Sequence, residues 1–565
     1  MLDMKWKPGS AKDVADYFLA ADYYLDEGKG FFGGRYAESL GFHGEVNRND
    51  LIGLLSNRTP LGGKITQRDV GNARRAMEWV FSPPKSFTIM AELSGDNRLY
   101  PAFVKSVEAT MKYAEQDAMR RVRDGGQNHD KYTGNLVYAI FPQKLSRPTK
   151  RLISTTALTP VWMAVPDPQD HAHVLVANAT RDPDSGKWYA LQADQLLRNQ
   201  HHYELFFREH LSKQLEKMGY KLDYSKGNFE IHGITREMIE KFSGRHLQIN
   251  AEADARNVTN PETRSKIARM GREKKTDRFT WEELQQIWIG RLTPTQLQTI
   301  RDIYATALGW GPRDAPDFSQ KYVDAAVEKL THQNTWVLER KVMTEALKTG
   351  LGKVSVEGIQ SHLDYLHSKG QILRRKRDLP ELTTKKARDK QIRVEDLWKA
   401  GMGRHEKLGR DVYTVKSPKS HLNALPKLYG SRDSFMSMRG NIGRPEAIKQ
   451  AMGDLGAAKV NNVNALPDTK VWFVEKFNDG DLPELMEKAT EQDVRVVFWG
   501  DKTPSDLEER LRLDPYFLFD KKETTLPVTR RLKEAVLNLI RRTHDREIER
   551  DRRSEKQPEK QWQHR

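Results

Sequence analysis

The chain has 565 residues, no cysteine, 37% hydrophobic and 30% charged residues, and a net charge of +16. Its length predicts several domains, and the missing cysteines exclude disulfides, thiolate zinc sites and cysteine nucleophiles. No apolar run approaches the roughly 20 residues that cross a bilayer, and the N-terminus lacks a signal-peptide core, so we expect a cytoplasmic protein without membrane insertion. The positive charge favours polyanionic partners such as nucleic acid, although many basic proteins bind none.

Residues 1–250 are predicted to form one α/β unit. Helical spacing is visible over 106–122 and 203–220. Three apolar runs between them have the composition of strands: 134–141, 159–165 and 173–180. Helices and strands that are clustered in this way predict a sheet with helices packed against it, an α+β layer.

The middle of the chain is predicted to be basic and helical. Residues 251–320 form a basic helical connector, in which Thr280 and Glu283 match a capping box. Residues 321–400 contain three helix-like periods and the strand-like ILRRK, with Ser355 as an N-cap, and end in a charged linker over 377–400. Helices followed by a short strand resemble a winged helix, which is either a DNA reader or only a packing module.

Residues 401–540 are predicted to form a second α/β domain. Its apolar runs at 470–477 and 494–501 suit buried parallel strands with a helix between them. The tail over 541–565 is charged, and its composition predicts no packed structure.

Tyr17, Tyr23 and Tyr24 in DYFLAADYY are the first candidate catalytic residues. A tyrosine hydroxyl can attack a phosphodiester and hold the DNA end as a phosphotyrosine. Tyrosines are also ordinary amphipathic packing residues, and the spacing by itself favours packing.

His171 and His173 in DHAHVLVAN are the candidate metal ligands. On a strand, residues i and i+2 share a face, so both imidazoles can point at one ion, although a catalytic metal usually has a third protein ligand. Glu78 and Lys85 lie in EWVFSPPKS, where a carboxylate can accept a proton or orient a ligand histidine. The alternative is a solvated pair at a strand–turn junction.

Taken together, these segments resemble the MobF-class conjugative relaxases. The shared segments follow the family's order across about residues 1–250: ADYF…DYY, RYAESLGFHGEV, EWVFSPPKS, LSGDNRL, TGNLVYAIF, HAHVLVAN, SGKWYAL, MGYKLDY and FSGR. The resemblance implies an α+β relaxase domain of the HUH type, with a central antiparallel sheet whose central strands carry the metal-binding histidines.

The resemblance also implies roles for single residues. Tyr17 matches the nicking nucleophile, and Phe18 replaces its partner in the family's first tyrosine pair. Tyr23 and Tyr24 match the second pair, which is implicated in the second strand transfer. Glu78 takes the place of an aspartate in the family.

His171 and His173 match two of the family's three metal-binding histidines, and the third is replaced. The corresponding FNHDTSR-like segment here reads FPQKLSR, which places Gln143 at the ligand position, and an insertion follows at 148–165. An alternative alignment of the gap puts Pro160 there instead. A neutral amide oxygen is a weaker ligand than imidazole but suits Mg²⁺ or Mn²⁺, so we expect a divalent ion of this kind if the site is active.

The C-terminal half resembles a superfamily 1 helicase in part. VWFVEKF and VRVVFWGDKTP are similar to its second and third ATPase motifs, but the acidic pair is reduced to Glu475 beside Lys476. The chain contains no GxxxxGK[ST] loop, and GLGKVS is too short to cradle phosphates. We therefore expect no ATP binding and a vestigial helicase-like domain that grips single-stranded DNA.

The leading hypothesis is a protein that binds single-stranded DNA at a transfer origin and nicks one strand by tyrosine transesterification for plasmid transfer, with conjugation accessory and coupling proteins as partners. The main alternative is a relaxase-shaped DNA-binding protein with neither nicking nor ATPase activity. A third hypothesis is a general nucleic-acid regulator that uses residues 322–376.

Overall fold

The computed structural model describes residues 1–7, 9–21, 29–67, 75–124, 126–156, 159–225, 227–258, 260, 263, 279–310, 317–376, 379–408, 428–438, 445–475 and 477–499. They divide into an N-terminal unit, Met1–Ile392 with Asn478–Gly480, and a C-terminal unit, Arg393–Phe477 with the residues from Asp481 onward. Among these residues no helix is both long and apolar enough to span a membrane.

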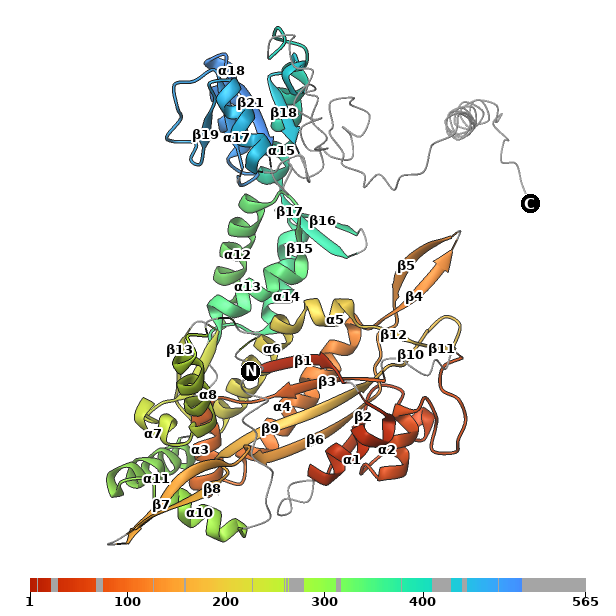
Figure 1. Ribbon diagram of the computed structural model, residues 1–565. Helices are drawn as coiled ribbons and strands as arrows, with labels where there is room; N and C mark the ends of the chain where they lie inside the picture. The colour runs from red at the N-terminus through yellow and green to blue at the C-terminus, as the bar shows by residue number, and fades with distance from the viewer. Residues whose placement is uncertain are drawn as a thin grey trace, which may run out of the picture. The chain divides into compact units, whose positions relative to one another are not determined.

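A five-stranded antiparallel sheet forms the centre of the N-terminal unit (Figure 1). In spatial order its strands are β1 (Leu2–Trp6), β3 (Ala76–Phe81), β9 (Pro168–Ala177), β6 (Tyr138–Leu145) and β2 (Phe31–Gly33). Most residues of β3, β6 and β9 are buried, because helices cover both faces of the sheet. The predicted central antiparallel sheet is confirmed.

The two faces of the sheet have separate cores. Helices α3 (Lys85–Leu93), α4 (Leu99–Ala114) and α6 (Gln200–Lys217) cover the face that carries Trp79 and Phe81. Helices α1 (Ala11–Ala21) and α2 (Arg48–Leu55) cover the other face. Because successive side chains on a strand point to opposite faces, Glu78 and both histidines of β9 project toward α1.

Helix α4 ends earlier than the predicted helix over 106–122. After a short 3-10 turn (Glu115–Asp117) the chain enters β4 (Met119–Asp124), which pairs with β5 (Gln127–Tyr132). The strand is preferred because the next segment supplies cross-strand partners, including Asp130 at 3.1 Å from the Arg121 guanidinium. The second predicted helix, over 203–220, is confirmed as α6.

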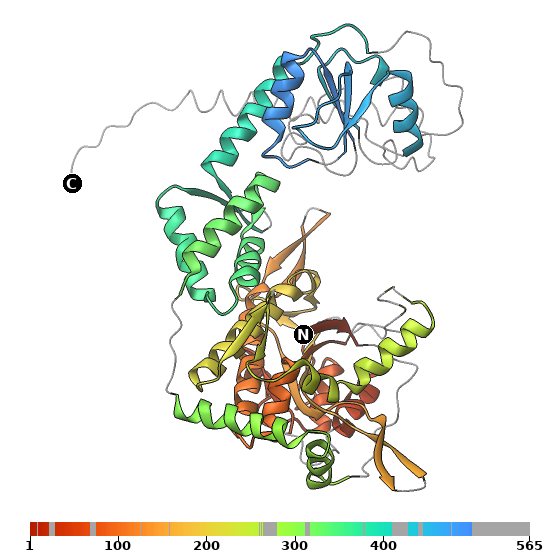
Figure 2. The ribbon, with the colours of Figure 1, turned by 90° about the vertical axis from the view of Figure 1, so that its left-hand side faces the viewer.

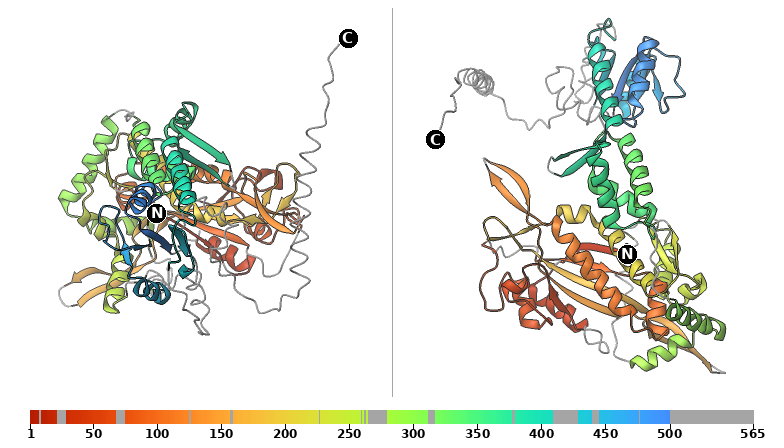
Figure 3. Two further views of the ribbon diagram at one scale, coloured as in Figure 1. Left: turned by 90° about the horizontal axis from the view of Figure 1, so that it is seen from above. Right: turned by 180° about the vertical axis from the view of Figure 1, so that it is seen from behind.

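The insertion after Arg147 folds back on itself. Strand β7 (Thr149–Thr156) pairs with β8 (Thr159–Val165) as a separate hairpin that projects from the sheet (Figure 3). Strand β6 precedes the insertion and β9 follows it, and the two strands pair with each other from Tyr138↔Val176 to Leu145↔Pro168. Pro160 lies in the hairpin opposite Thr155, so the alternative alignment that placed it at the ligand position is wrong.

Further elements complete this part of the unit: β10 (Thr180–Arg181), β11 (Trp188–Tyr189), β12 (Leu191–Gln192), α5 (Asp194–Arg198), β13 (Leu222–Ser225), β14 (Asn228–Ile231), α7 (Arg236–Lys241), α8 (Gly244–Ala255), α10 (Trp281–Ile289) and α11 (Pro294–Gly309). The Thr280–Glu283 capping box is present at the start of α10, as predicted. Residues 264–278, the most basic part of the predicted connector, lie outside the described residues.

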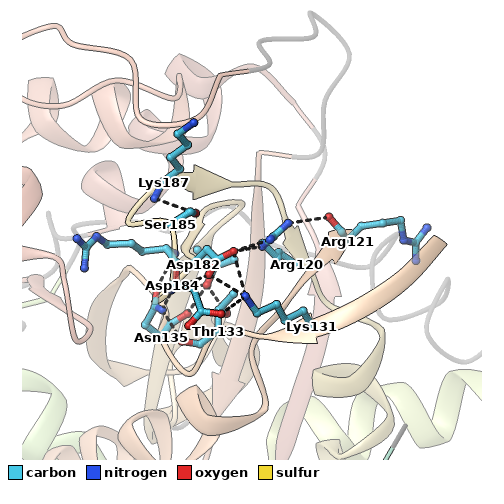
Figure 4. A network of polar contacts seen from close by, with 11 residues as sticks. Arg120, Arg121, Lys131, Thr133, Asn135, Asp182, Asp184, Ser185 and Lys187 are labelled. Atoms are coloured by element: carbon cyan, nitrogen blue, oxygen red, sulfur yellow. Dashed lines mark hydrogen bonds and ion pairs between the residues drawn. The ribbon is translucent and has the colours of Figure 1, made fainter. Parts of the chain in front are cut away.

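The buried carboxylate of Asp182 ties the β4–β5 ribbon to the turn after β10 (Figure 4). It accepts hydrogen bonds from the Arg120 guanidinium at 2.5 Å, from the Lys131 ammonium at 3.1 Å and from the Asp184 amide at 2.9 Å. Burial by itself raises the pKa of Asp182, but these three partners outweigh it and lower the pKa to about 2.

Asp182 is therefore expected to make the N-terminal unit less stable in acid. A folded-state pKa below the ordinary 3.8 stabilises the folded protein above about pH 4, and this contribution is lost as the pH falls toward about 2. We expect Asp182→Asn to lower the free energy of unfolding in urea at pH 7 by about 1 kcal/mol, since solvent partly screens the network, and by less at pH 3. Asp184→Asn, at a carboxylate that is 77% exposed, is the control. An equal loss for Asp182→Asn at both pH values would contradict this assignment.

Residues 319–384 have the element order of a winged helix. The elements are α12 (Ser319–Gln333), β15 (Val337–Leu338), α13 (Glu339–Gly350), α14 (Val356–Ser368), β16 (Ile372–Lys376) and β17 (Pro380–Thr384). Their hydrophobic core also includes Leu205 and Phe206 of α6. Ser355 caps α14 by accepting a hydrogen bond from the Gly358 amide, as predicted.

The charged linker predicted over 377–400 is wrong for most of its length. Strand β17 pairs with β16, and α15 (Lys385–Ala400) follows directly. The prediction failed because charged residues outnumber the few apolar residues that are buried, such as Leu382 on the strand and Trp398 on the helix.

The C-terminal unit is built on a four-stranded parallel sheet (Figure 2, blue). In spatial order its strands are β18 (Phe435–Met438), β21 (Arg495–Trp499), β20 (Val471–Val474) and β19 (Ala458–Val460), accompanied by α17 (Pro445–Asp454) and α18 (Leu482–Glu491). The two predicted buried parallel strands and the helix between them are confirmed. Residues from 500 onward, including the charged tail, lie outside the described residues.

The buried side chain of Arg495 holds two loops of the C-terminal unit by hydrogen bonds to their backbone. Its guanidinium donates to the backbone carbonyls of Asp433 at 3.0 Å, Glu406 at 2.9 Å and Ser431 at 2.6 Å. Burial lowers the pKa of Arg495 to about 10, so the group stays charged at neutral pH. It supplies donors to carbonyls that the sheet does not pair.

Arg495→Met is expected to destabilise the C-terminal unit by about 2–4 kcal/mol, because it removes the guanidinium donor from the Asp433 and Glu406 carbonyls and leaves the Ser431 carbonyl with the Leu408 amide only. Urea unfolding followed by tryptophan fluorescence measures the change. The matched control is Arg393→Met, which removes an arginine that is 58% exposed and pairs with Glu487. Equal stability of the two variants would overturn the anchoring role.

Candidate active site

The two predicted histidines lie side by side on β9. Their ring centroids are 5.0 Å apart, and both rings project toward α1. In the antiparallel register His171 lies directly opposite Gln143 of β6, and directly opposite residues project to the same face. Gln143 is only 3% exposed. The fold thus brings all three predicted metal ligands to one patch of the sheet, which we call the histidine patch.

The hydrogen bonds of the two imidazoles prepare them to bind a metal. The Nδ1 of His173 contacts a Glu78 carboxylate oxygen at 2.9 Å, and the Nδ1 of His171 contacts the Gln169 carbonyl at 2.8 Å. Both oxygens can only accept, so each Nδ1 carries the proton and donates it. The lone pair is then on Nε2, the tautomer that a metal-binding histidine needs.

Glu78 is a buried anion surrounded by positive charge. Its side chain is 2% exposed, with the Lys7 ammonium at 3.3 Å and the Lys5 ammonium at 3.6 Å. Burial alone raises the pKa of Glu78. The hydrogen bond from His173, the charge that this imidazole carries when it is protonated, and the charges of Lys7 and Lys5 outweigh burial and lower the pKa to about 2. A carboxylate of such low basicity is suited to orient His173 rather than to accept a proton.

Lys85 is partly buried and its ammonium is hydrogen-bonded, so the interpretation of Glu78 and Lys85 as a solvated pair is wrong. The Lys85 ammonium donates to the Pro168 carbonyl at 2.9 Å and contacts the side chain of Gln169. Burial lowers the pKa of Lys85 to about 8. Lys85 thereby holds the beginning of β9, just before His171, against the first turn of α3.

Tyr17 lies on α1, beside the histidine patch. Its side chain is 41% exposed, whereas Phe18 is fully buried and packs against Phe141 and His173, each at a centroid distance of 5.4 Å. The ring of Tyr17 meets Phe18 edge-on at 5.0 Å, and the Lys7 ammonium lies 4.2 Å from its centroid. Tyr23 and Tyr24 lie outside the described residues.

A sequence profile places the chain among known proteins. The profile of the TrwC relaxase family matches residues 11–294, half of the chain, and this range contains Tyr17 and the histidine patch. The chain belongs to the TrwC relaxase family.

Two relatives carry the name multifunctional conjugation protein TraI. The TraI of Escherichia coli strain K12 is 32% identical over 255 residues, which cover 42% of this chain and 13% of TraI. Another Escherichia coli TraI is 27% identical over 398 residues, which cover 64% of this chain and 21% of TraI. The chain therefore spans about a fifth or less of the length of these relatives.

Solved structures of the conjugative relaxase TrwC are similar to this chain. TrwC with oriT DNA in a metal-free form is 28% identical with a TM-score of 0.44, covering 52% of this chain and 97% of TrwC. TrwC with a 27-mer DNA comprising the recognition hairpin and the cleavage site is 27% identical with a TM-score of 0.45, covering 53% and 99%. A metal-bound TrwC complex is 28% identical with a TM-score of 0.45, covering 54% and 98%.

The donor set of this TrwC-family chain fits a divalent cation that is held by few ligands. The imidazoles of His171 and His173 and one neutral amide lie on one face of the sheet, with Glu78 behind His173 as the orienting carboxylate. Within the described ranges, no three His, Cys, Asp or Glu side chains come together as a metal cage. Gln143 stands beside the two histidines as the one neutral member of this set.

Two residues of this site were not predicted from the sequence. Lys5 lies on β1 and pairs directly with Glu78 in the β1–β3 register, and Lys7 follows directly after the strand ends at Trp6. The KWK pattern indicates two cations on one face of a strand. It does not indicate which carboxylate they meet, because β1 and β3 lie some seventy residues apart in the chain, as the 71-residue separation of Lys7 and Glu78 shows.

Proposed function

We propose that this chain binds single-stranded DNA at a transfer origin and nicks one strand by tyrosine transesterification. The observation that carries the proposal is the placement of the half-exposed Tyr17 beside the Glu78–His173 pair, in a chain of the TrwC relaxase family. The surplus of positive charge favours contacts with DNA phosphates.

In the proposed reaction the Tyr17 hydroxyl oxygen attacks the scissile phosphorus. Tyr17 gives up its hydroxyl proton as the new oxygen–phosphorus bond forms, and the bond from phosphorus to the 3′ oxygen breaks. The 3′ oxygen takes up a proton and leaves as a hydroxyl, and the 5′ phosphate stays on Tyr17 as a phosphotyrosine. Glu78 holds His173 in the tautomer that carries its proton on Nδ1 and its lone pair on Nε2. A Mg²⁺ or Mn²⁺ ion on His171, His173 and Gln143 would supply positive charge to the phosphate oxygens. Tyr23 and Tyr24 would serve the second strand transfer.

A second candidate function is DNA binding without cleavage. It is favoured by two replacements: Gln143 stands where the family resemblance implies a histidine, and Phe18 stands where it implies a tyrosine. Phe18 is fully buried, so its ring contributes to the core and the fold does not need a second hydroxyl at this position.

We further propose that the C-terminal unit is a vestigial helicase-like domain that grips single-stranded DNA without using ATP. Its parallel strands support the helicase-like fold. The Glu475 carboxylate forms an ion pair with Lys459 at 2.5 Å, and this pairing supports the absence of ATP use.

Residues 322–376 are a weaker candidate for reading duplex DNA. In the wing, Arg374 pairs with Glu339 and Asp364. We expect conjugation accessory and coupling proteins as partners, in the cytoplasm.

The test is whether the whole chain forms a covalent adduct with DNA. The chain is incubated with 3′-labelled single-stranded fragments that tile the transfer region of the element encoding it, in Mg²⁺ or Mn²⁺. The proposal predicts a labelled band at the mass of a protein–DNA adduct on a denaturing gel, and peptide mapping places the phosphotyrosine at Tyr17. Tight binding without any adduct supports the second function.

A further inference from the structure

We propose that Lys7 is a positioning residue that holds Tyr17 against the Glu78–His173 pair for strand cleavage. The inference rests on the proposed nicking function and deepens it. It assigns a role to the residue that directly follows β1, which the motifs of the sequence did not single out.

The contacts of Lys7 join three elements of the site. Its ammonium lies 3.3 Å from one Glu78 carboxylate oxygen and 3.4 Å from the other, so the ion pair with β3 is bidentate. The same ammonium lies 4.2 Å from the centroid of the Tyr17 ring and 4.7 Å from that of Phe18 on α1. The Lys7 amide donates to the Ala76 carbonyl at 3.0 Å, which extends the pairing of β1 with β3.

These contacts restrain a ring that is otherwise half exposed. An ammonium is attracted to the face of an aromatic ring, and here the ion pair with Glu78 fixes the ammonium in place. Glu78 also orients His173, so one carboxylate sets the positions of both the imidazole and the Tyr17 ring. A displacement of a reacting group by about 1 Å can slow a reaction about a hundredfold, so this restraint matters for the attack on phosphorus.

Lys5 allows the positioning role to be separated from simple neutralisation of Glu78. Its ammonium lies 3.6 Å from Glu78 and its side chain is 47% exposed, compared with 17% for Lys7. Both lysines therefore balance the buried carboxylate, but the ammonium that lies over the Tyr17 and Phe18 rings is that of Lys7. A role in neutralisation alone predicts similar losses for the two lysines, and a positioning role predicts a larger loss at Lys7.

The first measurement compares single-turnover cleavage with DNA affinity in the full-length chain. We expect Lys7→Met to slow cleavage by about 10- to 100-fold while the Kd for the same oligonucleotide changes less than about threefold. Lys7→Arg keeps the cation and should recover most of the rate. Lys5→Met should cleave at least about fivefold faster than Lys7→Met. Cleavage by Lys7→Met at the wild-type rate, or an equal loss in Lys5→Met, would overturn the proposal.

The second measurement does not depend on cleavage. Hydrogen–deuterium exchange of the α1 amides, Ala11–Ala21, should be faster in Lys7→Met than in wild type and less affected in Lys5→Met. If the wild-type chain cleaves no DNA, the proposed function fails, and exchange alone decides whether Lys7 restrains α1. Unchanged α1 exchange in Lys7→Met would reject the positioning role even if nicking is demonstrated.

Discussion

Tyr17→Phe is expected to lower the single-turnover rate of strand cleavage by at least about a thousandfold, because it removes the oxygen that forms the phosphotyrosine. The phenylalanine ring can keep the contacts with Phe18 and with the Lys7 ammonium. Folding and DNA affinity should therefore stay close to those of wild type. The rate is measured with a 3′-labelled oligonucleotide on a denaturing gel, and affinity is measured by fluorescence anisotropy with the same oligonucleotide.

Tyr365→Phe is the matched control for this experiment. Tyr365 is also about half exposed, at 51%, and lies on α14 of the winged-helix segment. It should cleave like wild type. An adduct that persists in Tyr17→Phe would contradict the assignment of the nucleophile, and peptide mapping would then show whether Tyr23 or Tyr24 carries the DNA.

Gln143→His is expected to tighten the binding of Mn²⁺ at the histidine patch by at least about tenfold. Gln143 lies directly opposite His171 on the neighbouring strand, so the substitution adds a third imidazole to the same face. Conversely, His171→Ala should abolish saturable Mn²⁺ binding, because one imidazole and one amide are too few ligands. Isothermal titration calorimetry of the metal alone measures both effects and needs no DNA.

His129→Ala serves as the control, because His129 is an exposed histidine on the β5 ribbon. It should leave Mn²⁺ binding unchanged. If the wild-type chain shows no saturable binding and Gln143→His does, the replacement of one ligand accounts for a disabled site, and the DNA-binding function without cleavage is favoured. If neither wild type nor Gln143→His shows saturable Mn²⁺ binding, the patch is not a metal site.

Local features were predictable because their physical causes lie within a few residues of each other. His171 and His173 share a face because a strand repeats every two residues, and the structure confirms their adjacency. Thr280 and Ser355 cap helices because their oxygens reach amides three residues ahead. The shared order of motifs was also sufficient to indicate the family to which the chain belongs.

The sequence by itself determined which residue types are available: Tyr17 followed by Phe18, two histidines on one strand, and a glutamine where the family resemblance implies a third histidine. The tertiary structure decided which of them meet. Glu78 and His173 are 95 residues apart, and Lys7 and Glu78 are 71 apart, so their contacts depend on strand register. Register is set by the packing of both sheet faces, which no short segment encodes. For the same reason only the fold showed that the insertion closes as a hairpin and leaves Gln143 opposite His171.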